Sequence, residues 1–229
     1  MEIILLRQEG ETVDGRELKG AAMRARLRAA TEELIAEVGV NAASAAAIAQ
    51  KCGVSRGAML HHYPTRDELI IDTAAHFWRR ARDIVATLAD DMSAGRTDVA
   101  TFVDRLYEDV FRANALVTML DLMVSGRDTR VGEAVNQILT DLFRSYEDLG
   151  VKAFDLSGVP PERIHVVITL IVSTLRGLRI QDNIHRDEAR VRDVLTMLVD
   201  AVHVILDRER AAAPAATPAP RARSARRRS

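Results

Sequence analysis

Residues 55–61, S-R-G-A-M-L-H, combine side chains that can contact the edges of nucleic-acid bases. The guanidinium fork of Arg56 can pair with O6 and N7 of guanine, the commonest base-specific contact, although a contact to phosphate alone is nearly as well supported. Ala58 and Leu60 are apolar groups of the kind that contact a thymine methyl. Gly57 has no side chain to hold the backbone away from a duplex. These residue types predict contact with DNA.

The same stretch must be positioned by a short helix that follows a tight turn. Residues 44–51 are rich in Ala and lack Gly and Pro, which predicts a helix. Gly53 then provides the residue that a left-handed turn needs. Ser55 can cap a second helix, which ends before Pro64 and turns Met59 inward. Two short helices joined by a Gly-containing turn of about three or four residues are typical of a helix-turn-helix unit.

The residues that could support catalysis or bind a metal are sparse. His61 and His62 diverge by about 100° on a helix, so they cannot share an ion, and neither has a partner at the i, i+4 spacing. The single cysteine, Cys52, excludes an intramolecular disulfide and fits a reducing cytoplasm, with packing its expected role and a redox switch the alternative. We find no nucleophile–base set and no phosphate-binding glycine loop, so we expect no enzyme, no metal and no cofactor.

Composition favours an all-α protein. The 229 residues are 48% hydrophobic but only 4% aromatic, which suits one or two helical domains with a large core. Apolar runs end short of the roughly 18 residues that span a bilayer, so we expect a cytoplasmic protein without a membrane segment. Five arginines after residue 211 contribute to the net charge of −1, and without them the body carries −6. The positive charge that attracts DNA must therefore be concentrated on one part of the surface.

The N-terminal third is expected to consist of an arm and two further helices. Residues 1–20 show no helical period and predict a mobile arm, with a phosphate contact through Arg16 or Lys19 as the alternative. Residues 21–38 are amphipathic. Arginines near the start of that helix could be solvated or could reach phosphate, and Arg28 is expected to point outward. Thr65 and Glu68 form a capping box that begins a helix reaching about residue 91, which would act as a lever between two domains.

The middle of the chain predicts helices at 99–113, 115–124 and 131–151, around an interior with several adaptable methionines. A cavity between such helices would suit a small amphipathic ligand. Each polar member alone is more simply explained as a surface or satisfied core group. The residues expected to line the cavity are Phe77, Tyr107, Phe111, Met119, Asp121, Met123, Asn136 and Phe143.

The last two helices, which begin near Pro161 and after a break at 183–186, are apolar on nearly all sides. Two such helices late in the chain predict a four-helix interface with a second copy, and an intrachain core is the alternative. A dimer would read two half-sites of a palindrome. The expected interface residues are Ile164, Ile168, Ile171, Leu175, Val191, Val194, Leu195, Leu198, Val202 and Ile205.

Residues 48–69, IAQKCGVSRGAMLHHYPTRDEL, resemble the IA-x-x-A-G-V-S-x-G-x-L-Y-x-H-F-x-x-K-x-x-L pattern of the tetracycline-repressor (TetR) family. The resemblance covers about residues 23–69, and the remaining helical chain agrees with the family only in length. Ala43 replaces a capping Thr, with Ser44 as a substitute. Leu60 replaces a Tyr that touches phosphate, and Arg66 replaces a Lys, which keeps the charge and adds a fork.

The resemblance implies a three-helix DNA-binding domain at 21–66 and a ligand-binding and dimerisation bundle at 67–210. The Pro-, Ala- and Arg-rich composition of residues 211–229 predicts a disordered basic tail, which could add salt-sensitive DNA affinity or only solubility. The resemblance also implies a homodimeric regulator, most simply a repressor that a small molecule releases from a palindromic operator in double-stranded DNA. The residues expected to contact DNA are Ser44, Ser55, Arg56, Gly57, Ala58, Leu60, His61, His62, Tyr63, Arg66 and Arg24.

Three other classes of protein remain open from the sequence. A DNA-binding protein that responds to no ligand would depend on its basic tail, and a regulator controlled by a partner protein would have a bundle interior filled with side chains. An enzyme would keep its turnover when Arg56 is replaced. The sequence does not identify the ligand, the operator, the target genes, or whether binding represses or activates transcription.

Overall fold

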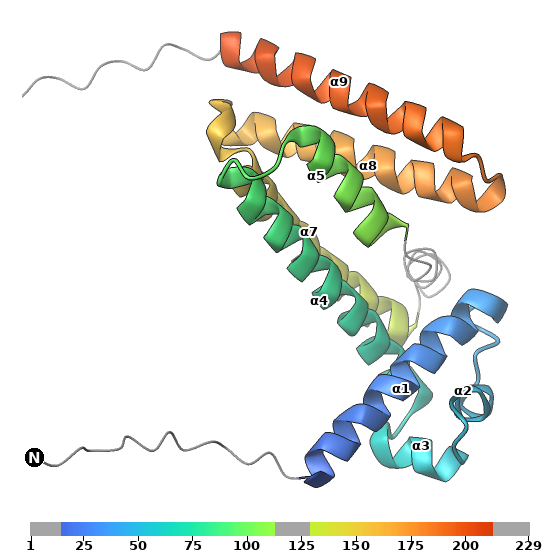
Figure 1. Ribbon diagram of the computed structural model, residues 1–229. Helices are drawn as coiled ribbons and strands as arrows, with labels where there is room; N and C mark the ends of the chain where they lie inside the picture. The colour runs from blue at the N-terminus through green and yellow to red at the C-terminus, as the bar shows by residue number, and fades with distance from the viewer. Residues whose placement is uncertain (1–14, 113–128, 213–229) are drawn as a thin grey trace, which may run out of the picture.

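The computed structural model describes residues 15–112 and 129–212, apart from the side chain of Leu156. Within those two stretches the chain is helical, without strands (Figure 1). The first three helices lie at one end of the molecule, and the helices from residue 66 onward form a bundle beside them (Figure 1). The elements are α1 (Gly15–Val38), α2 (Ala45–Cys52), α3 (Arg56–His62), α4 (Arg66–Ser93), α5 (Val99–Leu106), the π-helix η1 (Tyr107–Phe111), α7 (Arg130–Ala153), the 3-10 helix η2 (Asp155–Ser157), α8 (Pro161–Ile184) and α9 (Glu188–Ala212).

Helices α1, α2 and α3 form a compact unit, which we call the DNA-binding head. Leu27, Ile48 and Met59, one from each helix, are fully buried against one another's helices. Helix α1 begins at Gly15, so the expectation of an arm through residue 20 is wrong for its last six residues. That segment, G-R-E-L-K-G, contains good helix formers and an acidic residue in the first turn, which stabilise a helix start. The rest of the predicted arm, 1–14, lies outside the described residues.

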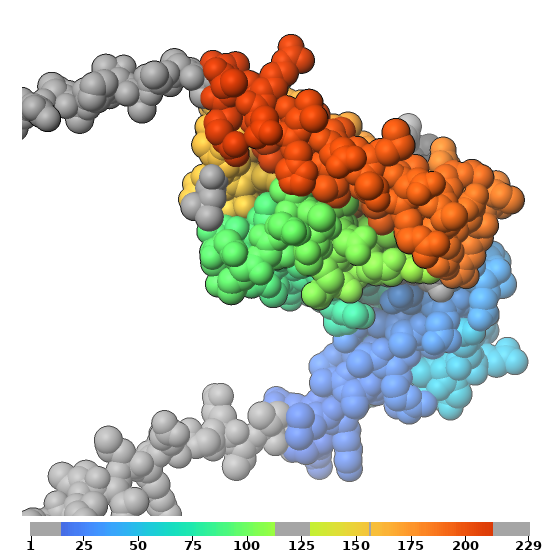
Figure 2. Space-filling model, turned by 45° about the horizontal axis from the view of Figure 1, so that its top comes forward, coloured from blue at the N-terminus to red at the C-terminus, as the bar shows by residue number. Residues whose placement is uncertain are grey.

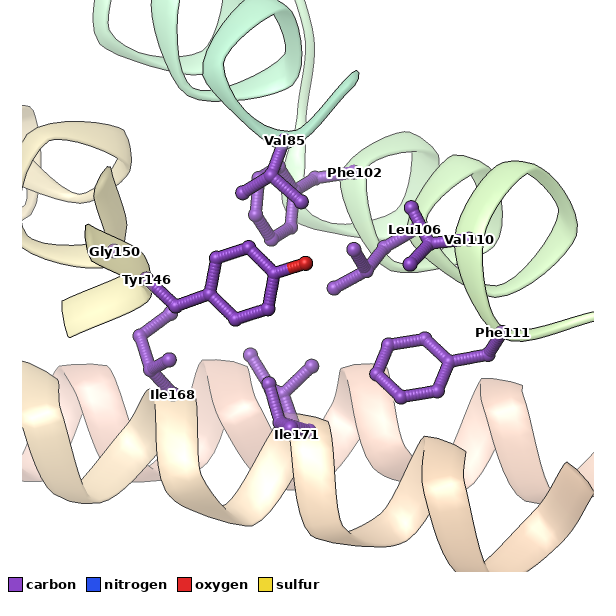
Figure 3. A pocket seen from close by; sticks show the side chains of 10 residues that line it. Val85, Phe102, Leu106, Val110, Phe111, Tyr146, Gly150, Ile168 and Ile171 are labelled. Carbon is purple, nitrogen blue, oxygen red and sulfur yellow. The ribbon is translucent and has the colours of Figure 1, made fainter. Parts of the chain in front are cut away.

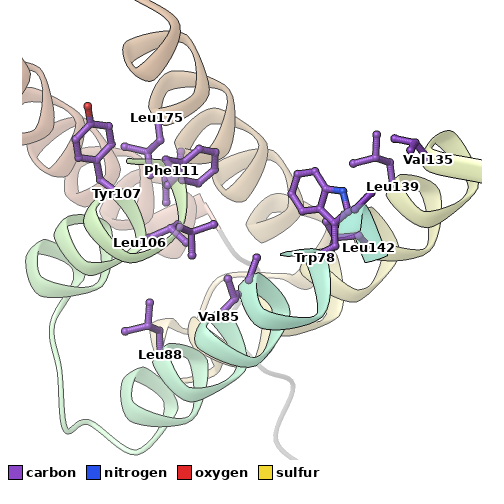
Figure 4. Close-up of a cluster of buried hydrophobic side chains, with 14 of the residues drawn as sticks. Trp78, Val85, Leu88, Leu106, Tyr107, Phe111, Val135, Leu139, Leu142 and Leu175 are labelled. Carbon is purple, nitrogen blue, oxygen red and sulfur yellow. The ribbon is translucent and has the colours of Figure 1, made fainter. Parts of the chain in front are cut away.

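Helix α4 links the head to the bundle, as the capping box predicts. The Thr65 hydroxyl accepts a hydrogen bond from the Glu68 amide at 3.1 Å, and the helix then continues for 28 residues. It lies alongside α7 over much of its length (Figure 1). Trp78 of α4 packs beside Leu139 and Leu142 of α7 (Figure 4). One straight element therefore contacts both functional regions.

Within the bundle, the apolar core continues between α4, α5, η1 and α8. Val85, Leu106, Phe111 and Leu175 are buried there (Figure 4). The predicted helix at 99–113 is α-helical only to Leu106 and continues as one π-turn. The predicted helix at 115–124 lies outside the described residues, whereas the one at 131–151 corresponds to α7.

Most of the residues of α8 and α9 that were predicted to form a dimer interface are buried within the single chain. Their assignment to an interface is corrected for the buried members, because each side chain is already covered by the chain's own bundle. An almost wholly apolar helix has two apolar faces, and its sequence does not say which one the bundle uses. The buried members are Ile164, Ile168, Ile171, Leu175, Leu195, Leu198 and Val202. Val191, Val194 and Ile205 are half-buried.

The opposite face of these helices leaves other apolar side chains uncovered. On α9, Met197 and Val204 are 70% and 68% exposed. On α8 the exposed members are Val166, Leu170, Ile180 and Ile184. Figure 2 shows α9 along the outside of the bundle. This face is available for a further contact.

Helix α8 is also long and apolar enough to cross a membrane by length and composition alone. It packs on α7, η1 and α9, and it carries Arg163, Arg176, Arg179 and Asp182. Core helices of bundles have this composition, so the feature is weak evidence for a membrane span.

Candidate DNA interface and ligand cavity

The turn between α2 and α3 has the geometry that the sequence predicts. Gly53 adopts φ 73° and ψ 33°, the left-handed conformation, and its amide donates to the Gln50 carbonyl at 3.0 Å. The next amide, of Val54, donates to the Ala49 carbonyl at 3.0 Å. These two bonds satisfy carbonyls that the end of α2 would leave unpaired. They also fix the direction in which α3 leaves the turn.

Helix α3 is capped by Ser55, whose hydroxyl accepts from the Ala58 amide at 3.1 Å. Met59 is fully buried, as predicted, and anchors the helix to the head. The opposite face carries Arg56, Gly57 and Ala58, all exposed. Arg56 forms no hydrogen bond or ion pair with any residue of the described ranges. Its guanidinium is therefore available to an external acceptor.

The remaining predicted DNA contacts on this side differ in exposure. His61 is exposed, whereas Leu60 and His62 are partly covered. The two imidazole rings lie 5.3 Å apart and edge to face. Ser44 is exposed, but its hydroxyl accepts from the Ala47 amide at 3.2 Å and caps α2, the task expected of a substitute for Thr. The exposed polar members of the predicted set on this side are thus Ser44, Ser55, Arg56 and His61.

Tyr63 is not part of that surface, which corrects its prediction as a DNA contact. Its side chain is buried, and its hydroxyl donates to Asp72 Oδ2 of α4 at 2.6 Å. Arg28 of α1 donates to the same carboxylate oxygen at 2.9 Å and to the Tyr63 hydroxyl at 3.3 Å. The expectation that Arg28 points outward is therefore also wrong. This Arg28–Tyr63–Asp72 cluster joins α1, the end of α3 and the second turn of α4.

The ionisation of this cluster follows from its contacts. Burial opposes the charge on Asp72, but hydrogen bonds from Tyr63 and Arg28 outweigh it and hold the pKa of Asp72 below its ordinary value. Burial, together with the bond to Asp72, raises the pKa of Tyr63 to about 12. The cluster is therefore an ionised carboxylate between a guanidinium and a neutral phenol.

Arg66 likewise serves the head from within, and its prediction as a DNA contact is corrected. Its Nε donates to the Ala43 carbonyl at 2.6 Å, and its guanidinium also donates to the Val40 carbonyl. The fork that Arg has and Lys lacks makes both bonds possible. Arg66 holds the α1–α2 loop against the first residue of α4.

The arginines of α1 have separate environments. Arg24 is exposed and remains a candidate for phosphate contact. Arg26 donates to the carbonyl of Cys52 at 3.0 Å, which ties α1 to the end of α2. The Cys52 side chain is buried, in agreement with a packing role.

The bundle encloses a small apolar cavity of about 20 Å³ (Figure 3). It lies where α4, α5, η1, α7 and α8 meet. Its lining includes Val85 of the linking helix α4 and Phe111 of the π-helix. The other lining residues are Phe102, Leu106, Val110, Tyr146, Gly150, Ile168, Ile171 and Val172. A volume this small holds about one or two water-sized groups, so the cavity is nearly filled by side chains.

Among the described members of the predicted ligand set, Phe111 alone lines this cavity. Asn136 and Phe143 are exposed and do not line it, because α7 turns those positions outward. Phe77 is half-buried and packs edge to face on Trp78, while Tyr107 is buried beside the cavity wall. Met119, Asp121 and Met123 lie outside the described residues. The prediction missed Tyr146, whose position three residues after Phe143 gave no separate signal.

Groups of His, Cys, Asp and Glu that could hold a metal ion do not occur within residues 15–112 and 129–212. Among the described residues, the exposed face of α3 and the apolar cavity are the regions that the expected DNA and ligand sites point to.

Comparisons with known proteins agree with this arrangement. The family described as "Bacterial regulatory proteins, tetR family" matches residues 27–73, which span most of the head and the start of α4. An uncharacterised HTH-type transcriptional regulator of Mycobacterium bovis is 27% identical over 157 residues, which cover 68% of this chain and 80% of the relative. The HTH-type transcriptional regulator CymR of Pseudomonas putida is 27% identical over 62% of this chain and 70% of its own length.

Solved structures show the same fold. The crystal structure of a TetR-family transcriptional regulator from Mesorhizobium loti superposes with a TM-score of 0.64 at 12% identity, over 82% of this chain and 98% of that one. The head, its match to the family and the relatives agree with one another. Residues 27–73 therefore match the DNA-binding domain of the TetR family, and the chain is similar in sequence and fold to transcriptional regulators that carry this domain.

Proposed function

We propose that the protein is a homodimeric repressor that a small molecule releases from a palindromic operator. The observation that carries this proposal is the position of α4. One end of this helix holds the head through Arg66 and Asp72, and Val85 near its other end forms part of the cavity wall. A ligand that widens the cavity would therefore move the helix on which the head is mounted.

The DNA contact of each protomer is assigned to the exposed face of α3, with Arg56 as the main base-reading side chain and Arg24 on phosphate. One helix of seven residues offers few base contacts, so a specific site requires two copies. Tilting α4 in both protomers would change the distance between the two α3 helices. They would then no longer fit successive major grooves.

The second copy is assigned to the uncovered face of α8 and α9. On α8 the residues of that face are spaced by four and three, as in a packed helical seam: Val166, Leu170, Ser173, Gly177, Ile180 and Ile184. On α9 the corresponding residues are Val194, Met197, Ala201 and Val204. Two such seams on each chain support a four-helix interface between two copies, which shares only Val194 with the interface residues that the sequence predicts.

The nearly filled cavity favours a second candidate, a regulator controlled by a partner protein. Such a protein needs no room inside its bundle. The two functions differ in what changes operator affinity: a small molecule in the first case, a macromolecule in the second. Both place the regulator in the cytoplasm, in accordance with its regulator relatives.

The test begins with selection of bound duplexes from random DNA, followed by fluorescence anisotropy on the selected duplex. We expect an enriched palindrome, two chains per half-site pair, and weaker binding by Arg56→Ala. A matched control is Arg144→Ala, an exposed arginine of α7 far from the head. Enrichment of no sequence, or equal operator affinity for Arg56→Ala and the control, would refute the assignment of α3.

A further inference from the structure

The apolar cavity contains one polar side chain among its ten lining residues, Tyr146. Its ring projects from α7 into the cavity, and its hydroxyl points toward Phe102 and Leu106 (Figure 3). That oxygen is buried and has no hydrogen-bond partner among the described residues. A buried hydroxyl without a partner is costly, because it loses its bonds to water and gains nothing in return. The position suits a ligand with an oxygen or nitrogen that can accept its proton.

A cation lies near Tyr146, just outside the set of residues that line the cavity. Arg176 follows the lining residue Val172 by four residues on α8, so the two share a helix face. Its guanidinium carbon is 5.4 Å from the ring centroid of Phe143, which precedes Tyr146 by three residues on α7. Arg176 is half-buried. It therefore sits at the seam of α7 and α8, next to Tyr146.

This guanidinium forms no ion pair with any carboxylate of the described ranges. Burial lowers the pKa of Arg176, and its charge opposes the rise that burial causes in the pKa of Tyr146. Most other partly covered arginines here are bound to an acid or a carbonyl, as Arg28 and Arg66 are. A desolvated cation without a counter-ion is expected to attract an anion, because pairing restores the interactions lost with water.

We propose that the cavity binds a small carboxylic acid with an apolar body, whose carboxylate contacts the Arg176 guanidinium and the Tyr146 hydroxyl. The body lies between Phe102, Phe111 and Ile171, where only apolar surface is available. This inference rests on the proposed function, since it names the class of molecule that would release the operator.

The small volume explains how binding would be coupled to DNA release. A ligand that fitted without movement would bind both states equally and shift nothing. An acid with six or more carbon atoms cannot enter a cavity of about 20 Å³ unless the lining moves. The movable parts are Val85 on α4 and the π-helix η1, a type of turn that occurs often at functional sites. Binding therefore selects a state in which α4 is displaced.

The experiment compares matched acids and alcohols by isothermal titration calorimetry on the full chain without DNA. The probes are octanoate and 3-phenylpropanoate, with 1-octanol and 3-phenylpropanol as their uncharged counterparts. We expect each acid to bind at least about tenfold more tightly than its alcohol, the size of a charge-assisted hydrogen bond.

Two variants assign the contacts. Arg176→Gln should weaken acid binding about tenfold or more and leave alcohol binding unchanged, and Tyr146→Phe should weaken both classes about threefold to tenfold. Arg144→Gln, an exposed arginine on α7, is the matched control and should change neither. Thermal unfolding of each variant verifies that it folds. Equal affinity for acid and alcohol, no binding by any probe, or loss of acid affinity in Arg144→Gln alone would overturn the proposal.

The same acids are then added to the protein bound to its selected duplex. Binding without release of DNA would refute the ligand-released repressor but leave the acid site standing. Release of DNA by the alcohols and not by the acids would refute the acid site but leave the ligand-released repressor standing.

Discussion

Replacing Gly57 with Ala should change stability and DNA affinity in opposite directions. Gly57 is exposed in α3, and a methyl group built on its Cα would meet only the Ser55 hydroxyl, at 3.9 Å. Packing within the chain therefore gives no reason for Gly there. Ala is the better helix former by about 0.5–1 kcal/mol. In a chain of this size that gain raises the melting temperature by about 1–4 °C.

The duplex is expected to respond differently. If the backbone of α3 approaches the groove at residue 57, the added methyl group separates it from its closest DNA contact. The loss of one hydrogen bond per half-site costs about 1 kcal/mol, or about 30-fold in affinity for a site read by two copies. Anisotropy with the selected duplex at fixed salt measures this change, and differential scanning calorimetry measures the melting temperature.

Gly20→Ala is the matched control, because a methyl group there meets only the flexible end of Arg24, at 3.7 Å. It should raise the melting temperature by a similar amount and leave operator affinity unchanged. The reasoning fails if Gly57→Ala binds the operator as well as the wild-type protein does. It also fails if the variant melts at a lower temperature, because the structure leaves room for the methyl group.

Further predictions concern the frame of the head and the dimer. Asp72→Asn should lower the unfolding free energy by about 1–2 kcal/mol at neutral pH. Because the pKa of Asp72 is depressed in the folded state, the difference in unfolding free energy between the two proteins should disappear as the pH falls below about 4. Acid titrations followed by circular dichroism measure this difference. Arg66→Lys keeps the charge but loses the fork, so it should lower the melting temperature by about 2–4 °C in calorimetry. Val204→Glu should leave unfolding nearly unchanged but give monomers in sedimentation velocity, whereas Thr196→Glu, on the side of α9 that faces α5, should remain dimeric.

The head could be predicted from the sequence because its signals are local. Gly53, Ser55 and Thr65 each act within four residues, through a left-handed turn or a cap, and the structure contains all three. Met59 follows from the same register. Such positions need no knowledge of the rest of the chain.

Errors arose where a side chain has two possible neighbours. Tyr63 and Arg66 are polar and close to α3, which favours DNA, yet each finds its partner on an element distant in sequence or across a loop. Ile171 and Leu175 are apolar on a helix that is apolar all round, so burial was predictable but the covering surface was not. Contacts between elements distant in sequence determine which neighbour each of these side chains has. The spacing of residues along one helix does not predict those contacts.

The cavity was the least predictable feature. Tyr146 and Gly150 belong to an amphipathic helix whose pattern fixes its inward face but not the voids along it. Gly150 allows α8 to approach closely, since a methyl group there would lie 2.5 Å from Cγ1 of Ile168. A void of this size depends on how five helices fit together. The sequence of any one of these helices does not determine that fit.

The bonds from Arg66 and Asp72 also affect how the regulator could be recombined with others. Because these residues of α4 hold the loop after α1 and the end of α3, the head includes the first two turns of α4. A hybrid joined at residue 66 would pair the foreign head with side chains selected for a different one. We infer that a junction beyond Asp72 would transfer operator preference intact, because the whole head then keeps its own contacts with α4.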